Sequence, residues 1–96
     1  MPTLRAAAAT SEIVADNGMI IGGGILAQPC GAQEAPLRAS ALLIKADQPV
    51  CLVSCDVLGL TRDLADEIAY RTGEACSIPF GNVLVAATHT HHAPST

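Results

Sequence analysis

The three histidines of the chain, His89, His91 and His92, lie together near its C-terminal end. The apolar segment Asn82–Ala87 that comes before them is typical of a strand. If the extended backbone continues through Thr90, His89 and His91 project to one side and His92 to the other. Imidazole is a ligand suited to zinc, and a catalytic zinc usually keeps three protein ligands and one open position. The spacing indicates part of a metal site. The alternative is that these are ordinary surface or hydrogen-bonded side chains.

The elements before the histidines indicate how they are positioned. Val50–Val57 is expected to be a strand and Thr61–Thr72 a helix, and Asn82–Ala87 is the strand that follows. Strand, helix and strand in this order form a βαβ unit, which has parallel strands joined by a right-handed crossover. The carboxyl ends of parallel strands meet at one edge, where ligands of open α/β sheets bind. Asp56 and His89 are therefore expected on the same side of the sheet.

Asp56 has two interpretations at this position. A carboxylate there can accept the second imidazole N–H of a metal-bound histidine and so fix its tautomer. The alternative is that Asp56 caps a loop or the following helix. A nucleophilic serine is not indicated, because Ser54 lies inside a strand and the chain has no Gly-x-Ser-x-Gly elbow.

The helix carries signals at both ends. Thr61 is a suitable N-cap, and Asp63 lies in the first turn, where the helix dipole favours a negative charge. Arg71 is placed in the last turn, and Gly73 is predicted to supply the left-handed residue that ends the helix. The stripe predicted to be buried consists of Leu64, Ala65, Ile68 and Ala69.

The N-terminal part of the chain is less regular. Leu4–Val14 favours a short strand or an irregular segment, because its alanine run suits a helix while its β-branched residues oppose one. Asp16–Gly18 is a turn signal, Gly22–Gly24 favours a glycine turn, and Ala27–Pro36 is typical of a surface loop.

Leu37–Lys45 is the remaining predicted strand. It ends at the turn Ala46–Pro49, and Val50–Val57 follows. A turn of this length commonly joins two antiparallel strands. The two strands are therefore expected to form a hairpin.

Composition limits the classes of protein. The 96 residues suffice for one small domain or part of a larger one, and a hydrophobic fraction of 50% excludes a disordered segment. The net charge of −4, with one Phe, one Tyr and no Trp, argues against binding to nucleic acid or to an anionic membrane. No signal peptide and no transmembrane segment is recognised, so a cytoplasmic location is the default expectation.

The cysteines are expected to be structural. Cys30, Cys51, Cys55 and Cys76 show no Cys-x-x-Cys spacing, which argues against a zinc ribbon or a thioredoxin-type motif. Cys51 and Cys55 face the same side of one strand, about 13 Å apart, too far to bridge each other. Reduced, buried thiols are the preferred interpretation.

Two of the predicted strands are almost entirely apolar, as strands covered on both faces are, yet the chain contains one clear helix. Something else must cover the other face of the sheet. The expected fold class is α/β, a partial mixed sheet with a βαβ unit. Residues 1–96 would then be the N-terminal portion of a larger domain, or a chain that depends on self-association or on another partner.

Two segments resemble a known family. The ending Gly-Asn-Val-Leu-Val-Ala-Ala-Thr-His-Thr-His-His-Ala-Pro-Ser-Thr resembles the Asn-Val-(apolar)-Thr-His-Thr-His-Ser-Gly-Pro motif of the neutral/alkaline non-lysosomal ceramidases. Val-Ser-Cys-Asp-Val-Leu-Gly-Leu, at the end of the preceding strand, is similar to the segment that comes before this motif in bacterial members. The likeness covers roughly Pro36–Thr96. His92-Ala93-Pro94 departs from it, because the family usually has Ser-Gly-Pro there.

The resemblance implies an amide hydrolase in which one Zn²⁺ ion activates water for attack on the N-acyl bond of a sphingolipid. His89 matches the zinc ligand of the motif, and His91 matches the histidine expected close to the substrate or the bound water. The family completes its zinc site with a histidine, a glutamate and a tyrosine far downstream.

The sequence therefore predicts the N-terminal α/β portion of a ceramidase-like zinc amidohydrolase for a lipid amide. In this prediction His89 binds zinc, and His91 and Asp56 act at the catalytic site. The chain by itself is expected to be inactive or nearly so. Two alternatives stay open: a metal-dependent hydrolase of another ester or amide, and a small non-catalytic α/β module.

Overall fold

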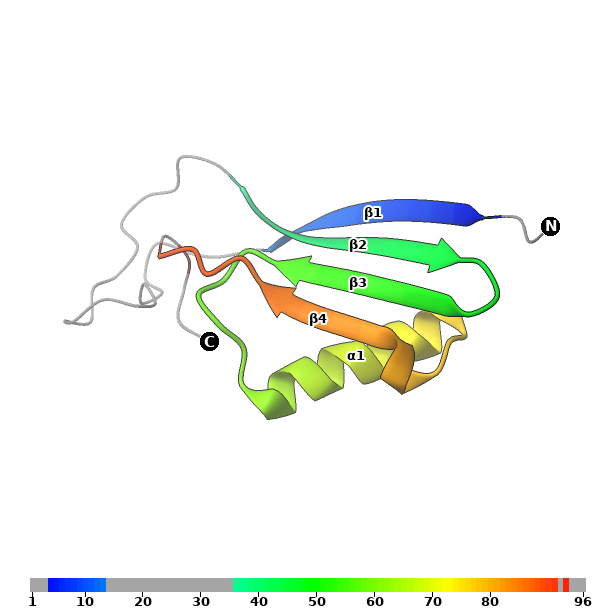
Figure 1. Ribbon diagram of the computed structural model, residues 1–96. Helices are drawn as coiled ribbons and strands as arrows, with labels where there is room; N and C mark the ends of the chain where they lie inside the picture. The colour runs from blue at the N-terminus through cyan, green and yellow to red at the C-terminus, as the bar shows by residue number, and fades with distance from the viewer. Residues whose placement is uncertain (1–3, 14–35, 92, 94–96) are drawn as a thin grey trace.

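The computed structural model describes residues 4–13, 36–91 and 93. Within them the chain forms a four-stranded sheet of order β1-β2-β3-β4 with one helix, α1, packed on it (Figure 1). This mixed sheet with a helix confirms the α/β class. The turns and loops predicted at Asp16–Gly18, Gly22–Gly24 and most of Ala27–Pro36 lie outside the described residues.

The first three strands are antiparallel. β1 is Arg5–Ile13, β2 is Leu37–Lys45 and β3 is Pro49–Cys55. Of the two predictions for the N-terminal segment, the strand is confirmed. β1 pairs with β2 along its whole length, from Arg5 opposite Lys45 to Ile13 opposite Leu37. β2 and β3 form the predicted hairpin, although β3 begins one residue earlier than expected, where Pro49 pairs with Lys45.

The last two strands are parallel and are joined through α1. After β3 the chain enters α1, Arg62–Cys76, passes through the short 3₁₀ helix η1, Phe80–Asn82, and returns in β4, Val83–Ala87. β3 and β4 pair in parallel, from Cys51 opposite Val83 to Cys55 opposite Ala87. The predicted βαβ unit is confirmed, and the sheet is mixed.

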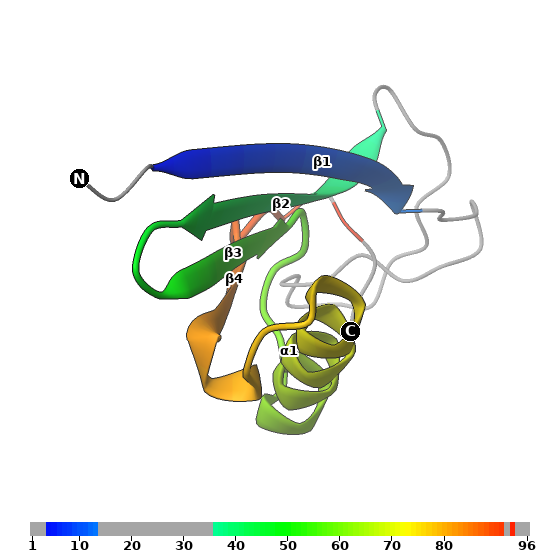
Figure 2. The same ribbon diagram turned by 90° about the vertical axis from the view of Figure 1, so that its right-hand side faces the viewer.

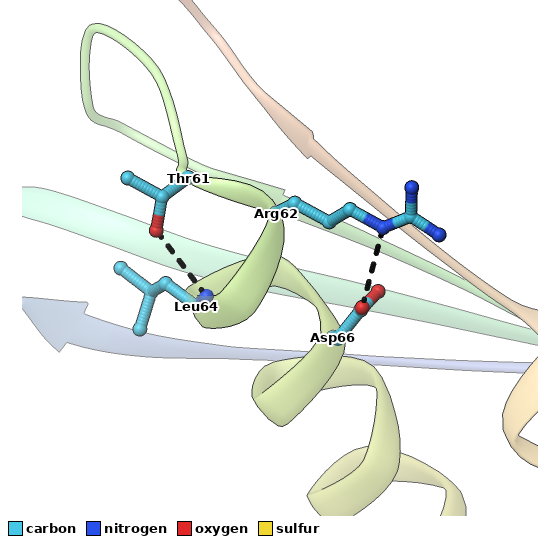
Figure 3. Close-up of polar contacts among 4 residues, drawn as sticks. All are labelled: Thr61, Arg62, Leu64 and Asp66. Atoms are coloured by element: carbon cyan, nitrogen blue, oxygen red, sulfur yellow. Dashed lines mark hydrogen bonds and ion pairs between the residues drawn. The ribbon is translucent and has the colours of Figure 1, made fainter.

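The start of α1 follows the sequence signals. The Thr61 hydroxyl accepts a hydrogen bond from the backbone N–H of Leu64 at 3.3 Å (Figure 3). Asp63 lies in the first turn. Arg62 and Asp66, one turn apart, approach to 3.7 Å. The predicted buried stripe is only partly right, because Leu64 remains 36% exposed.

The end of α1 differs from the prediction. Ser77, at φ 58° and ψ 42°, is the left-handed residue that ends the helix, and Gly73 lies inside it, buried. The N–H of Ser77 donates to the carbonyl of Glu74, and the N–H of Ile78 donates to the carbonyl of Gly73. These two bonds satisfy two of the last four carbonyls of the helix. Since α1 reaches Cys76, Arg71 is not in its last turn and pairs with Glu67 at 2.8 Å.

The helix covers only one face of the sheet, beside β3 and β4 and away from β1 (Figures 1 and 2). The core lies on this face, and its buried members are Cys51, Val53, Cys55, Val57 and Ala93. The opposite face carries exposed apolar side chains, namely Leu42, Val50, Leu52 and Leu84.

Among the described residues, no helix is long and apolar enough to cross a membrane.

Candidate functional site

The candidate site lies where the parallel strands β3 and β4 end. The last residues of these strands, Cys55 and Ala87, are opposite each other. The pairing of the two strands continues beyond the sheet, since the N–H of Thr88 donates to the carbonyl of Cys55 and the N–H of His89 to the carbonyl of Val57, both at 3.0 Å. These bonds bring the segment after β3 and the segment with the histidines to one edge, as the βαβ topology predicts.

His89 is held in a defined orientation. β4 ends at Ala87, and His89 has φ 67°, so the extended conformation does not continue through the histidines. Its ring Nδ1 lies 2.8 Å from the carbonyl oxygen of Leu58. A carbonyl oxygen can only accept a hydrogen bond, so Nδ1 carries the proton. In the neutral ring this leaves the lone pair on Nε2, the atom that would bind a metal.

His91 lies against His89. Their rings make an edge-to-face contact with centroids 5.0 Å apart and planes at 86°, and both residues are exposed. The structure thus brings the two predicted site histidines together, through the left-handed backbone of His89 and not through strand alternation. His92 lies outside the described residues.

Asp56 has a different partner from the one proposed for it. Its carboxylate Oδ2 accepts a hydrogen bond from the backbone N–H of Arg38, and its own N–H donates to the carbonyl of Arg38, both at 2.9 Å. Asp56 therefore continues the pairing of β3 with β2 by one residue. The acceptor at Nδ1 of His89 is the carbonyl of Leu58, two positions further along.

Two contributors to this edge were missed by sequence reasoning. The Leu58 carbonyl is a backbone group, and no residue type signals its role. Ala93 is 0% exposed and packs in the core, so the chain returns to the sheet directly after the histidines. A single small apolar residue after a polar run is too weak a signal to predict such an anchor.

The described part of the site brings together two histidine side chains that could bind a metal. Within residues 4–13, 36–91 and 93, no three histidine, cysteine or acidic side chains are grouped closely enough to hold a metal ion. A hollow of about 270 Å³ lies elsewhere, between α1, η1 and β4, with Asp66 and Phe80 in its lining. It is not part of the histidine edge.

Comparison with known proteins does not extend this picture. No protein-family model, curated protein or solved structure matches the chain. The likeness to the ceramidases therefore stays a prediction from the motif.

Proposed function

We propose that this chain supplies His89 and His91 to the zinc site of a ceramidase-like hydrolase, which cleaves the N-acyl amide bond of a ceramide or a related lipid. The observation that carries the proposal is the hydrogen bond from Nδ1 of His89 to the Leu58 carbonyl at 2.8 Å. Such a bond on the far side of the ring is typical of metal-binding histidines, because it fixes the tautomer and the ring orientation.

The spacing of the two rings places His91 beside the proposed zinc ligand, His89. The centroids of His89 and His91 are 5.0 Å apart. The position at the carboxyl ends of two parallel strands also agrees with the usual location of ligand sites in α/β sheets.

Each residue has a separate role in this proposal. Bound zinc supplies Lewis acidity and an activated water for amide hydrolysis at neutral pH. His89 presents Nε2 as a ligand. His91, exposed beside it, can hold a proton or a hydrogen bond at the reacting amide. Asp56 is a positioning residue, since it ties the end of β3 to β2. Other residues complete the ligand set.

A second candidate is a non-catalytic module that assembles with itself or with another part of a larger domain. The face of the sheet opposite α1 favours it, because Leu84 there is 63% exposed and Leu42, Val50 and Leu52 are each close to 40% exposed. Exposed apolar patches of this kind often mark sites of association. The two candidates are compatible, since a hydrolase domain could use this face for assembly.

Calorimetric zinc titration tests the proposed site. We expect binding to weaken by about tenfold or more in His89→Ala, which removes the proposed ligand, and by a smaller factor in His91→Ala, which removes the neighbouring imidazole. Glu74→Gln is the matched control, since it removes an exposed metal-binding group near the other end of α1 and should leave zinc affinity unchanged. Equal affinity of the wild type and both histidine variants would refute the site.

The reaction is tested separately with a fluorescent short-chain ceramide. Turnover by the zinc-loaded chain is expected to be very slow, because only part of the ligand set is present, and to fall further in both histidine variants. Turnover that persists unchanged in His89→Ala would show that hydrolysis does not depend on this site.

A further inference from the structure

Two cysteines from different elements meet on the buried face of the sheet. Cys51, near the beginning of β3, is 1% exposed and belongs to the core cluster. Cys76 is the last residue of α1 and is partly exposed. Both carry free thiols. One thiol is therefore accessible to a reagent, while the other is shielded behind it.

The crossover places these thiols side by side. η1 follows the end of α1, and the side-chain amide of Asn82 donates to the carbonyl of Pro49 at 3.0 Å. This bond ties η1 to the first residue of β3, and η1 also contacts α1, so η1 connects the helix to the beginning of that strand. After burial, the nearby Cys76 thiol is the next cause that raises the pKa of Cys51.

We propose that Cys51 and Cys76 form a dithiol site, which a small-molecule disulfide such as oxidised glutathione converts into an intramolecular disulfide that links the sheet to the helix. The site is independent of the proposed zinc site, since Cys51 lies near the amino end of β3 and the histidines lie beyond the carboxyl ends of the parallel strands. Its failure would leave the proposed function untouched.

The exchange balances in two steps. The thiolate of Cys76, the more exposed of the pair, attacks one sulfur of oxidised glutathione, forms a mixed disulfide and releases one glutathione thiolate. Cys51 loses its proton to water, and its thiolate attacks the Cys76 sulfur, releasing the second glutathione. Two protein thiols are oxidised, and one glutathione disulfide is reduced to two thiols.

Cys55 offers a matched control. It lies on the same strand and the same buried face as Cys51, and it is 7% exposed. Burial raises the pKa of both thiols, but the second cause is Cys76 for Cys51 and Asp56 for Cys55. Cys55 thus shares the burial of Cys51 and lacks its thiol partner.

The test is to incubate the folded full chain with oxidised glutathione, to block remaining thiols with iodoacetamide, and to map the peptides by mass spectrometry. We expect a Cys51–Cys76 cross-linked peptide in the wild type, in Cys55→Ser and in Cys30→Ser. In Cys76→Ser the cross-link should be lost. In Cys51→Ser it should be replaced by a glutathione adduct on Cys76.

The wild-type peptide map decides the proposal even if a serine variant fails to fold, and circular dichroism identifies such a variant. The unfolded chain is the control for the oxidising strength of the buffer. If the thiols of the unfolded chain become oxidised at a given glutathione ratio and those of the folded wild type stay fully reduced, the inference is overturned. A cross-link that joins Cys51 or Cys76 to a different cysteine would do the same.

Discussion

Asp56 connects the candidate site to the rest of the sheet through two hydrogen bonds with one residue. Its N–H and its carboxylate both bond to the backbone of Arg38 at 2.9 Å. The carboxylate lies at the end of the β2–β3 pairing, where it accepts from the backbone N–H of Arg38. Asp56, which its sequence position suggests as a partner of a metal-bound histidine, thus has a structural role.

We expect Asp56→Ala to lower the free energy of unfolding by about 1 kcal/mol, because the Arg38 N–H loses its acceptor. Asp56→Asn should retain most of the stability, since an amide oxygen can accept the same bond. Urea denaturation of the three proteins measures the difference. Equal stability of Asp56→Ala and wild type would show that this hydrogen bond makes no net contribution to the free energy of unfolding. In a separate zinc titration, the affinity should fall less in either Asp56 variant than in His89→Ala.

The end of α1 illustrates how packing between elements overrides a local signal. A Cβ added to Gly73 would lie 2.9 Å from the carbonyl oxygen of Ile78 and 3.6 Å from the backbone of Phe80. The glycine is needed because the chain folds back against the helix after Ser77. Gly73 is required for its small size, which avoids a clash with the returning backbone, and not for a left-handed conformation.

Gly73→Ala is therefore expected to destabilise the protein by about 1–3 kcal/mol, the usual cost of overpacking. Helix propensity alone predicts the opposite sign, a gain of about 1 kcal/mol for alanine over glycine. Thermal or urea unfolding distinguishes the two, and a more stable Gly73→Ala would show that the backbone can move aside at little cost.

Ser77→Gly is the companion substitution with the opposite expected sign. A non-glycine residue at φ 58° is strained, whereas glycine adopts this conformation freely. We expect a gain of up to about 1 kcal/mol in the same unfolding measurement. A loss of stability would indicate that the serine side chain contributes more than its backbone strain costs.

At the scale of the whole molecule, two of the buried core residues are cysteines, which links folding to alkaline pH. Burial raises the pKa of Cys51 and Cys55 above the ordinary value of 9.0, and Cys76 and Asp56 respectively raise it further. The unfolded chain therefore loses these protons at a lower pH than the folded protein does. The stability that neutral thiols provide is complete below pH 9.0 and decreases as the pH rises through the folded-state pKa.

The expected result is a fall in the free energy of unfolding above about pH 9, with a slope of at most about 1.4 kcal/mol per pH unit for each thiol. Urea unfolding of the wild type and of Cys55→Ala across this range measures it. The variant should lose less stability on going to alkaline pH, even if it starts from a lower value. Identical slopes for the two proteins would exclude a contribution from Cys55.

Among the described residues, the sheet is covered on one side only. The face with α1 holds the core, while the opposite face exposes Leu84 and its apolar neighbours on β2 and β3. Burying such side chains is favourable by about 25 cal/mol per Å². This is the physical reason to expect that another part of a domain, or a second chain, packs against the sheet.

The sequence by itself determined the helix, the strands β2, β3 and β4, and the pairing of β3 with both of its neighbours, whereas it left β1 and its pairing with β2 open. Alternating and continuous apolar runs predicted the strands, a short turn predicted the β2–β3 hairpin, and Thr61 marked the start of the helix. The order strand, helix, strand predicted the parallel pair, and with it the edge at which Asp56 and His89 emerge. These features depend on local patterns, and local patterns are visible in the chain.

Only the tertiary structure decided the contacts at that edge and at the end of the helix. Nδ1 of His89 bonds to a backbone carbonyl, and Asp56 bonds to the backbone of a strand far away in sequence. Gly73 lies inside the helix because the returning chain packs on it, and Ser77 takes the left-handed position. Backbone donors and acceptors are the same for almost every residue type, so which of them meet depends on the fold and not on the local sequence.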